Sequence, residues 1–527
     1  MKKNLVILFG ALFIFTSGYF IWSIWNQESS ADLWDFVPEN SGLVYESNDL
    51  GGTLLRLQDL ESFQSLIRIP SLGKLPDHIA KIERLTGLNS FYSFLDKTSG
   101  IISLHNTGKN EFDFLYLVAM NDLNTTDVVS KLITPLVAKA IEKQPRTYLG
   151  FELNEVSLSF TASHLTYLIY DHYFIASFTP YLVEDAIRTF EDENYKSFRE
   201  VFAEHQQITK IKQDEGNVYL NYKSFIKGTQ AFAANDLDKK FLTSAFLDLN
   251  IEDDHISLSG FSFADSSKIL QMIKGITGAP LDMSDVISNG TSILHHFSFQ
   301  DPYLWRDQQK NTDLLDQKTS YSNLSVIPRD ALEFLDQEIG RAIQLRNGQK
   351  VPILIIECKN SEGLIHYLDA IAKQIPNQRS DHFFVEQYKQ HIIRKLPVKN
   401  LPVLLFGDIA KDLPEGYYSS FENYVLMSPN LPVLKEFLSD ILNENTWGKT
   451  LSKKKFLKKI NKASPHTIIV NGAESWDHLY PAMQPQWQND FMVSEMIFKS
   501  FGHLAIQFSS IDDKYFTSIF IEKNSPS

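Results

Sequence analysis

The feature that most constrains the fold of this chain is an internal sequence repeat that covers most of its length. Residues 35–45 (DFVPENSGLVY) return as residues 285–295 (DVISNGTSILH). Further matches follow in the same order along the chain: residues 173–177 with 424–428, 220–221 with 470–471, and 253–254 with 512–513. Collinear self-similarity of long period indicates repeated structural units. The sequence therefore predicts two tandem copies of one domain, residues 32–280 and 281–527, joined without a Gly/Ser-rich or Pro-rich linker.

One acidic residue recurs in both predicted copies. Asp96 and Asp336 each follow Phe-Leu and precede a glycine four residues on, Gly100 and Gly340. A carboxylate in such a place can serve a binding site, or it can cap a turn in which the glycine adopts an unusual backbone angle. We interpret both aspartates as structural turn residues.

Each copy has the pattern of an α+β domain with a largely antiparallel sheet. Short alternating apolar runs are separated by hairpin signals, such as Asn347 and Gly348 between residues 343–345 and 351–357. Apolar residues then recur at helical spacing in residues 128–137 and 364–371. Because strands do not alternate regularly with helices, a doubly wound parallel sheet is unsupported.

The N-terminus predicts a membrane anchor. Residues 5–25 carry no charge and follow Lys2 and Lys3. About 20 apolar residues span a bilayer core as a helix, and preceding lysines favour an N-terminus inside the cell. We expect residues 1–31 to form a signal anchor in the bacterial inner membrane, with the remaining chain periplasmic or extracellular. The alternatives are a cleaved signal peptide ending near Ala31, which would make the protein secreted, and a buried soluble helix.

The composition limits which kinds of partner the chain can bind. The net charge is −14, and the basic residues are spread through the chain. Nucleic acid needs a concentrated basic surface, so it is excluded as a partner, and anionic lipid is disfavoured as the main one. The single cysteine, Cys358, rules out an intramolecular disulfide framework, and its apolar neighbours predict an inert buried thiol.

No catalytic, cofactor-binding or metal-binding motif is present. Gly448, Lys449 and Thr450 look like the end of a phosphate loop, but Asn443 stands where that loop needs its first glycine. His295 and His296 form the only histidine doublet. Neighbouring residues on a strand point to opposite faces, so these two are poorly placed to share a metal ion. We therefore predict no catalytic residue, no cofactor and no metal.

One basic stretch breaks the duplication. Residues 453–462 (KKKFLKKINK) have the spacing of a helix whose apolar residues, Phe456 and Ile460, face the core. The lysines then fan into water as an ordinary solvated face, or they bind an acidic partner. The possible partner-binding residues are Lys453, Lys454, Lys455, Lys458 and Lys459.

The opening of the chain carries a resemblance. With an apolar N-terminal segment followed by residues 37–45 (VPENSGLVY), the chain resembles exported, membrane-anchored bacterial proteins of an uncharacterised family found in Bacteroidota. The second copy departs from this opening, since Ser288 stands where Pro38 does. The resemblance implies an exported protein and brings no activity and no site residue with it.

Three hypotheses about function remain. The first is a non-enzymatic, membrane-anchored envelope protein that acts as a binding or assembly module for an envelope protein, a lipid or an anionic polymer. The second is a carrier that holds a lipid or another hydrophobic ligand in an apolar cavity. The third is a hydrolase whose site is dispersed through the sequence. A deep apolar pocket would favour the carrier, and convergent acids or histidines would favour the enzyme.

Overall fold

The computed structural model describes residues 32–60, 73–108, 111–120, 128–138, 140–158, 164–202, 215–229, 242–252, 254–264, 268–308, 328–374, 385–460, 463–511 and 514–523. The predicted anchor, residues 5–25, lies outside these residues, as do the turn residues Asp253, Asp512 and Asp513. Among the described helices, none combines the length and the apolar character needed to cross a bilayer.

Twenty strands of the described residues form one sheet, and every pairing in it is antiparallel. The first ten strands are β1 (Leu43–Ser47), β2 (Gly100–Gly108), β3 (Glu111–Ala119), β4 (Ala140–Tyr148), β5 (Phe151–Leu158), β6 (His164–Tyr170), β7 (Tyr173–Ser177), β8 (Asn217–Asn221), β9 (Ser244–Glu252) and β10 (His255–Phe263). The other ten are β11 (Thr291–Ser298), β12 (Leu335–Arg346), β13 (Gln349–Cys358), β14 (Val385–Tyr388), β15 (His391–Leu396), β16 (Gly416–Phe421), β17 (Tyr424–Ser428), β18 (His466–Asn471), β19 (Phe501–Ile511) and β20 (Lys514–Lys523).

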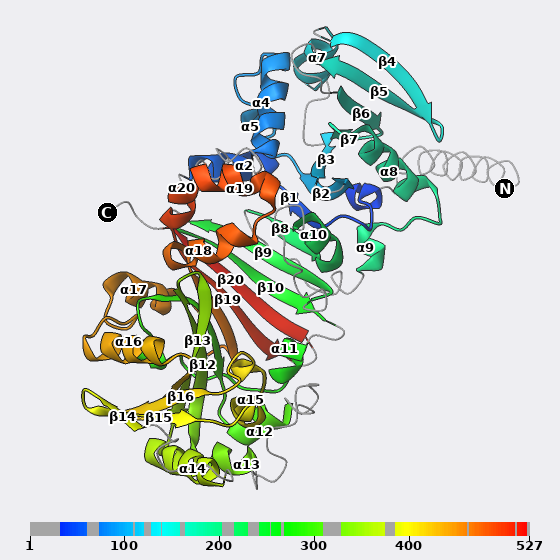
Figure 1. Cartoon of the computed structure of the whole chain (residues 1–527). Coiled ribbons are helices and arrows are strands. Elements are labelled where there is room, and N and C mark those ends of the chain that lie inside the picture. The colour runs from blue at the N-terminus through cyan, green and yellow to red at the C-terminus, as the bar shows by residue number, and fades with distance from the viewer. Residues whose placement is uncertain are drawn as a thin grey trace, which may run out of the picture.

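The two halves pair their strands in the same order. In the first half the order across the sheet is β4-β5-β6-β7-β3-β2-β1-β8-β9-β10. In the second half it is β14-β15-β16-β17-β13-β12-β11-β18-β19-β20. Strand β10 then pairs with β20, so the two last strands join the halves into an elongated molecule (Figure 1). The predicted α+β class with antiparallel pairing is confirmed.

Helices pack along the sheet. The first half has η1 (Leu33–Phe36), α2 (Leu50–Asp59), α4 (Lys74–Thr86), α5 (Phe91–Phe94), η3 (Val128–Ile133), α7 (Thr134–Ala138), α8 (Pro180–Glu191), α9 (Phe198–Val201), α10 (Tyr222–Thr229) and α11 (Lys268–Met272). The second has η5 (Met283–Val286), α12 (Pro302–Gln308), α13 (Pro328–Ala331), η8 (Leu332–Phe334), α14 (Ser361–Lys373), α15 (Leu401–Phe406), η10 (Gly407–Ala410), α16 (Leu431–Leu442), α17 (Leu451–Lys459), α18 (Gly472–Ala482), α19 (Pro485–Val493) and α20 (Glu495–Ser500).

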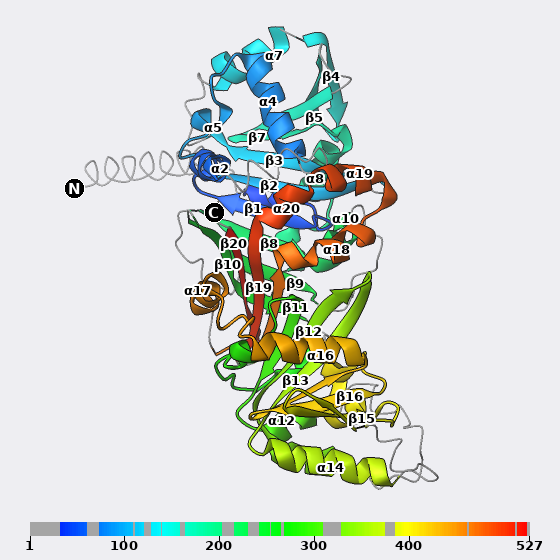
Figure 2. The ribbon, with the colours of Figure 1, turned by 60° about the vertical axis from the view of Figure 1, so that its left-hand side comes forward.

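The halves differ most in their inserted helices. In the second half α15 and η10 lie between β15 and β16, and α18 to α20 fill the connection from β18 to β19, beside the junction of the halves (Figure 2). Helix α11 belongs to the first half by sequence, yet its Leu270, and Ile273 just after it, are buried in the same core as Phe299 and Trp305 of the second half. Packing therefore ties this segment to the half that follows it.

The matched aspartates occupy different structures. Asp96 follows α5 in a turn, whereas Asp336 lies inside β12, next to an irregularity in its pairing with β13. Gly100 lies opposite Ser47 and Gly340 opposite His296. The reading of Asp336 as a turn residue is therefore wrong, because the strand begins before the glycine rather than at it.

Candidate functional site

The basic stretch forms helix α17, which one aromatic side chain holds on the sheet. Phe456 is fully buried and stacks on the His503 ring, with ring centroids 4.7 Å apart. Ile460 follows the helix and is also buried. Burial of one large aromatic ring stabilises such a short helix more than its own propensity does.

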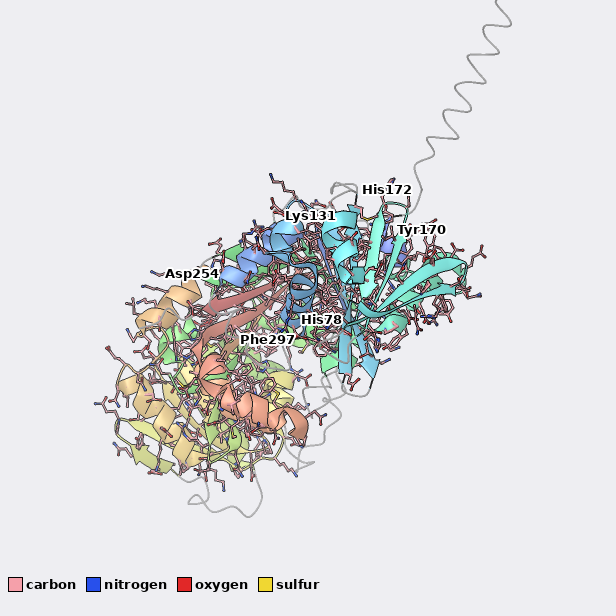
Figure 3. The ribbon with its side chains drawn as sticks, turned by 90° about the horizontal axis from the view of Figure 1, so that it is seen from above. His78, Lys131, Tyr170, His172, Asp254 and Phe297 are labelled. Carbon is pink, nitrogen blue, oxygen red and sulfur yellow. The ribbon has the colours of Figure 1, made fainter. Side chains whose placement is uncertain are left out.

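The lysines of α17 divide into two groups. Lys453 is half-buried, donates from Nζ to the Asn289 carbonyl at 3.1 Å and lies over the Trp447 ring. Burial lowers the pKa of Lys453 to about 8. Lys459 forms an ion pair with Asp254 of the first half, at the β9–β10 turn. Asp254 is labelled in Figure 3.

The other three lysines form the exposed basic face, Lys454, Lys455 and Lys458. All three are exposed, and within the described residues no ion pair involves any of them. Three neighbouring ammonium groups can attract an anionic surface at short range. The candidate face is thus smaller than the five lysines that the sequence suggested.

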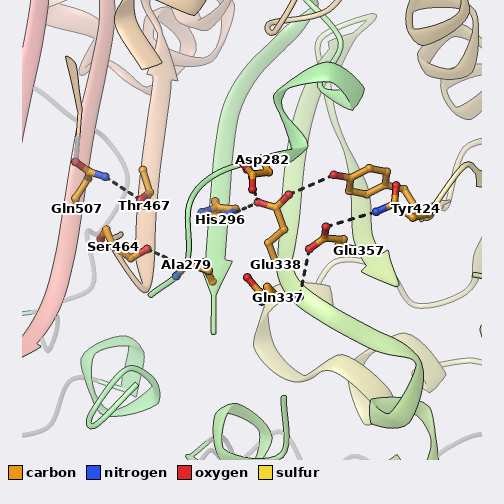
Figure 4. Close-up of polar contacts among 12 residues, drawn as sticks. Ala279, Asp282, His296, Gln337, Glu338, Glu357, Tyr424, Ser464, Thr467 and Gln507 are labelled. Carbon is orange, nitrogen blue, oxygen red and sulfur yellow. Dashed lines mark hydrogen bonds and ion pairs between the residues drawn. The ribbon is translucent and has the colours of Figure 1, made fainter. Parts of the chain in front are cut away.

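A buried carboxylate network lies in the second half (Figure 4). Glu338 of β12 accepts from Nε2 of His296 at 3.0 Å and from the backbone N–H of Asp282 at 3.0 Å. The Tyr424 hydroxyl lies 3.4 Å from its other oxygen. Both Glu338 and His296 are only 1% exposed, so they are closed to a substrate. These hydrogen bonds offset the free-energy cost of burying the Glu338 carboxylate.

A second carboxylate stands beside this network. Glu357 of β13 accepts from the Gln337 backbone N–H at 3.2 Å. Burial, reinforced by the neighbouring charge of Glu338, raises the pKa of Glu357 to about 7. Two acids and a histidine meet here from separate strands, and sequence spacing did not single out any of the acids. The only local signal was an acidic residue inside an otherwise apolar strand.

The histidine doublet divides between the two faces of the sheet, as strand alternation requires. His296 binds Glu338, while burial, with help from Arg341, lowers the pKa of His295 to about 4. His466 of β18 stacks on Phe297 at 4.3 Å. These rings serve packing and the carboxylate network.

Three side chains at the β9–β10 turn are close enough to hold a metal ion. Potential ligand atoms of Glu252, Asp254 and His255 lie within 4.8 Å of one another. Hydrogen bonds from His255 and Lys459 lower the pKa of Asp254 to about 2. The Lys459 ammonium already neutralises Asp254. We therefore interpret the cluster as part of the ion pair between the halves and not as a metal site.

An apolar cavity of about 40 Å³ lies in the first half, between the helices and the sheet. Its lining includes Leu54, Ile79 and Leu136 from the helices and Val118 and Ala176 from the strands. His78 of α4, which is labelled in Figure 3, and Tyr116 also line this cavity. The Nδ1 atom of His78 lies 2.8 Å from the Tyr116 hydroxyl.

The structure also shows the surroundings of Cys358 and of the segment that resembles the end of a phosphate loop. Cys358 is 2% exposed, and burial raises the pKa of its thiol to about 12, as suits an inert thiol. Lys449 pairs with Asp285, and the Gly448 backbone N–H donates to the Ser284 carbonyl. The segment that looked like part of a phosphate loop therefore holds η5 in place.

Comparison of the chain with models of protein families, with curated proteins and with solved structures found no match.

Proposed function

We propose that this chain is a non-enzymatic binding or assembly protein of the bacterial envelope, tethered to the inner membrane by residues 5–25. In this proposal the described residues lie outside the cytoplasm, or the protein is secreted if the segment is cleaved near Ala31. The resemblance to exported Bacteroidota proteins supports the location. The proposed family and the proposed location rest on the N-terminal sequence, whereas the proposed binding role rests on helix α17.

We also propose that residues 32–280 and 281–527 are tandem copies of one domain. The shared strand order supports this, and so do two matching bridges, Pro38 with Ser197 and Ser288 with Thr446. Pro38 and Ser288 align in the repeated sequence. A single domain duplicated and joined through like strands gives a long, continuous scaffold.

The observation that carries the binding role is the exposed basic face of α17. The chain as a whole carries a net charge of −14, whereas Lys454, Lys455 and Lys458 lie together on one exposed helix, and among the described residues no ion pair involves any of them. We propose that the face binds an acidic protein segment or an anionic polymer of the envelope. Overall negative charge would oppose a close approach to an anionic bilayer.

The test is binding of the full chain to immobilised polyglutamate at several salt concentrations. The variant K454Q/K455Q/K458Q should lose most of the binding, and the wild-type interaction should weaken as salt rises. The control K373Q/K399Q/K411Q removes three exposed lysines of the second half outside α17 and should bind like the wild type. If both variants lost polyglutamate binding equally, the binding would depend on net charge alone and not on the exposed basic face. Vesicles containing phosphatidylglycerol distinguish a lipid partner.

The other two hypotheses have weaker support. A carrier needs room for its cargo, and about 40 Å³ is far below the volume of a whole lipid. A hydrolase needs a reachable acid and base, and His296 and Glu338 are sealed in the core.

A further inference from the structure

The second half carries a surface cleft of about 470 Å³ beside the β12–β13 hairpin. Its buried lining is apolar and comes from the hairpin: Ile343, Val351 and Pro352. Its exposed lining includes Asp412 and Pro414, which follow η10. Ligand pockets commonly measure about 300–1,000 Å³. This cleft therefore has room for a small organic molecule, whereas the enclosed apolar cavity of the first half has not.

Two cations and one carboxylate line the cleft. Arg341 of β12 donates from Nη2 to the Asp412 carboxylate. Lys350 of β13 is exposed, and among the described residues no ion pair involves it. Two positive charges against one negative charge leave a local excess of one positive charge, in a chain whose net charge is −14. The charge of the lining therefore favours an anionic ligand.

The Arg341 guanidinium has a hydrogen-bond donor that Asp412 does not use. Its Nε atom is buried and has no hydrogen-bond partner among the described residues. Arg346, on the same strand, shows the complete arrangement, since its Nε and Nη2 donate to the two oxygens of Glu436 at 2.8 and 2.5 Å. Two-point pairing is a strong form of the arginine–carboxylate contact, and a buried donor without an acceptor costs free energy. A carboxylate that accepts from both Nε and Nη2 would thus bind Arg341 better than Asp412 does.

The exposures of the two partners show which one can give way. The side chain of Arg341 is 16% exposed, whereas that of Asp412 is 57% exposed. An ion pair with a largely exposed partner contributes little to stability, because water solvates the released charge well. Asp412 can therefore turn into solvent at small cost and leave its place to the carboxylate of a ligand.

This ion pair is specific to the second half. Tyr116 and Leu354 are counterparts, because they lie opposite the fourth residues of β7 and β17, respectively. On the neighbouring strands, Ile102 lies opposite Tyr116 and Arg341 lies opposite Leu354. Ile102 is buried in the core of the first half. The repeated strand order therefore does not require an arginine at this position.

We propose that the cleft binds a small organic acid with one carboxylate and an apolar body. The ligand carboxylate displaces Asp412 from Arg341, and the apolar body packs on Ile343, Val351 and Pro352. Lys350 adds attraction at the rim. The proposal uses none of the lysines of α17, so it is independent of the exposed basic face.

A saturation-transfer NMR titration of the full chain with 4-phenylbutyrate tests the proposal. We expect saturable binding, and much weaker binding of the neutral analogue 4-phenylbutanamide and of acetate, which lacks the apolar body. Arg341→Gln should weaken the binding by about tenfold or more. Asp412→Asn removes the competing carboxylate and should tighten it by up to about fivefold. Glu415→Gln is the matched control, because it removes the same charge from an exposed residue outside the cleft lining and should leave the affinity unchanged.

Four results would overturn the proposal. The first is no binding of 4-phenylbutyrate to the wild type, and the second is equal binding of the amide, which would show that the carboxylate is not recognised. The third is unchanged binding to a folded Arg341→Gln variant. The fourth is an Asp412→Asn variant that binds no more tightly than Glu415→Gln, and this comparison decides the matter if Arg341→Gln does not fold.

Discussion

Ser259 and Ser518 lie directly opposite one another where β10 pairs with β20. Each stands four residues beyond the first residue of its strand. Two residues away on either side, the opposed pairs are Ser257 with Phe520 and Phe261 with Phe516. Neighbouring antiparallel strands are related by a local two-fold axis between opposed residues, and this serine pair lies the same number of residues from the start of both strands.

The junction predicts a specific cross-link. Residues directly opposite in an antiparallel pair have Cα atoms about 4.5–5.5 Å apart, within the range for a disulfide. S259C/S518C should therefore form a disulfide under mild oxidation, detected by non-reducing electrophoresis after cleavage between the halves. S257C/S518C is the control, because diagonal neighbours lie about 7–8 Å apart. Equal cross-linking of both pairs would contradict the register.

Met427 predicts the cost of opening a cavity in the second half. Met427→Ala should destabilise the protein by about 2–5 kcal/mol, because the fully buried side chain leaves a space that its neighbours cannot fill. Denaturant unfolding measures the change. Met496→Ala makes the same substitution at a residue that is 87% exposed, and its effect should stay within about 0.5 kcal/mol.

Glu357 predicts a loss of stability as pH rises. Its pKa is raised from 4.5 to about 7, so the folded state holds a proton that the unfolded state releases between these values. Glu357→Gln should therefore stabilise the protein by about 1 kcal/mol at pH 8, allowing for partial solvent exposure, and much less at pH 4. Glu362→Gln, at an exposed site on α14, should show no such pH dependence.

His105 predicts sensitivity to acid. It is buried against Ser41 and Ser103, and burial lowers its pKa to about 3. Only the unfolded state takes up this proton below about pH 6.5, so stability falls between pH 6.5 and 3. His105→Gln should flatten that fall in unfolding experiments at pH 7, 5.5 and 4. His172→Gln changes an exposed histidine and should leave the slope as it is.

Helix α17 predicts a separation of stability from binding. Phe456→Ala should cost about 3–5 kcal/mol, because a fully buried ring is removed. K454Q/K455Q/K458Q should change stability by no more than about 0.5 kcal/mol, because exposed charges contribute little. Thermal and denaturant unfolding compare the two. A large destabilisation by the lysine changes would contradict the exposed face.

Local patterns predicted the elements well where hydrophobic period and turn chemistry agree. The helix expected from Ser361 is α14, with Asn360 as its cap, and the hairpin at Asn347 and Gly348 joins β12 to β13. The pattern was less informative at residues 128–137, which form a π-helical segment followed by the short α7. Helical spacing alone does not distinguish these hydrogen-bond patterns.

The candidate sites depended more on tertiary structure. The sequence predicted that Phe456 and Ile460 are buried beneath the lysines, and they are. It did not show that Lys453 turns toward Asn289 or that Lys459 pairs with Asp254, since both partners are remote in the chain. The cavity near Ala176 was also invisible, because a gap depends on the sizes of side chains from several elements at once.

By itself, the sequence determined the α+β class, the burial of Cys358 and the basic helix, because each follows from residues close together in the chain. Only the tertiary structure decided that β10 meets β20 and that Glu338 binds His296 and Tyr424. Strand order and buried ion pairs depend on which distant surfaces satisfy each other's hydrogen bonds and apolar area, and no local pattern encodes that choice.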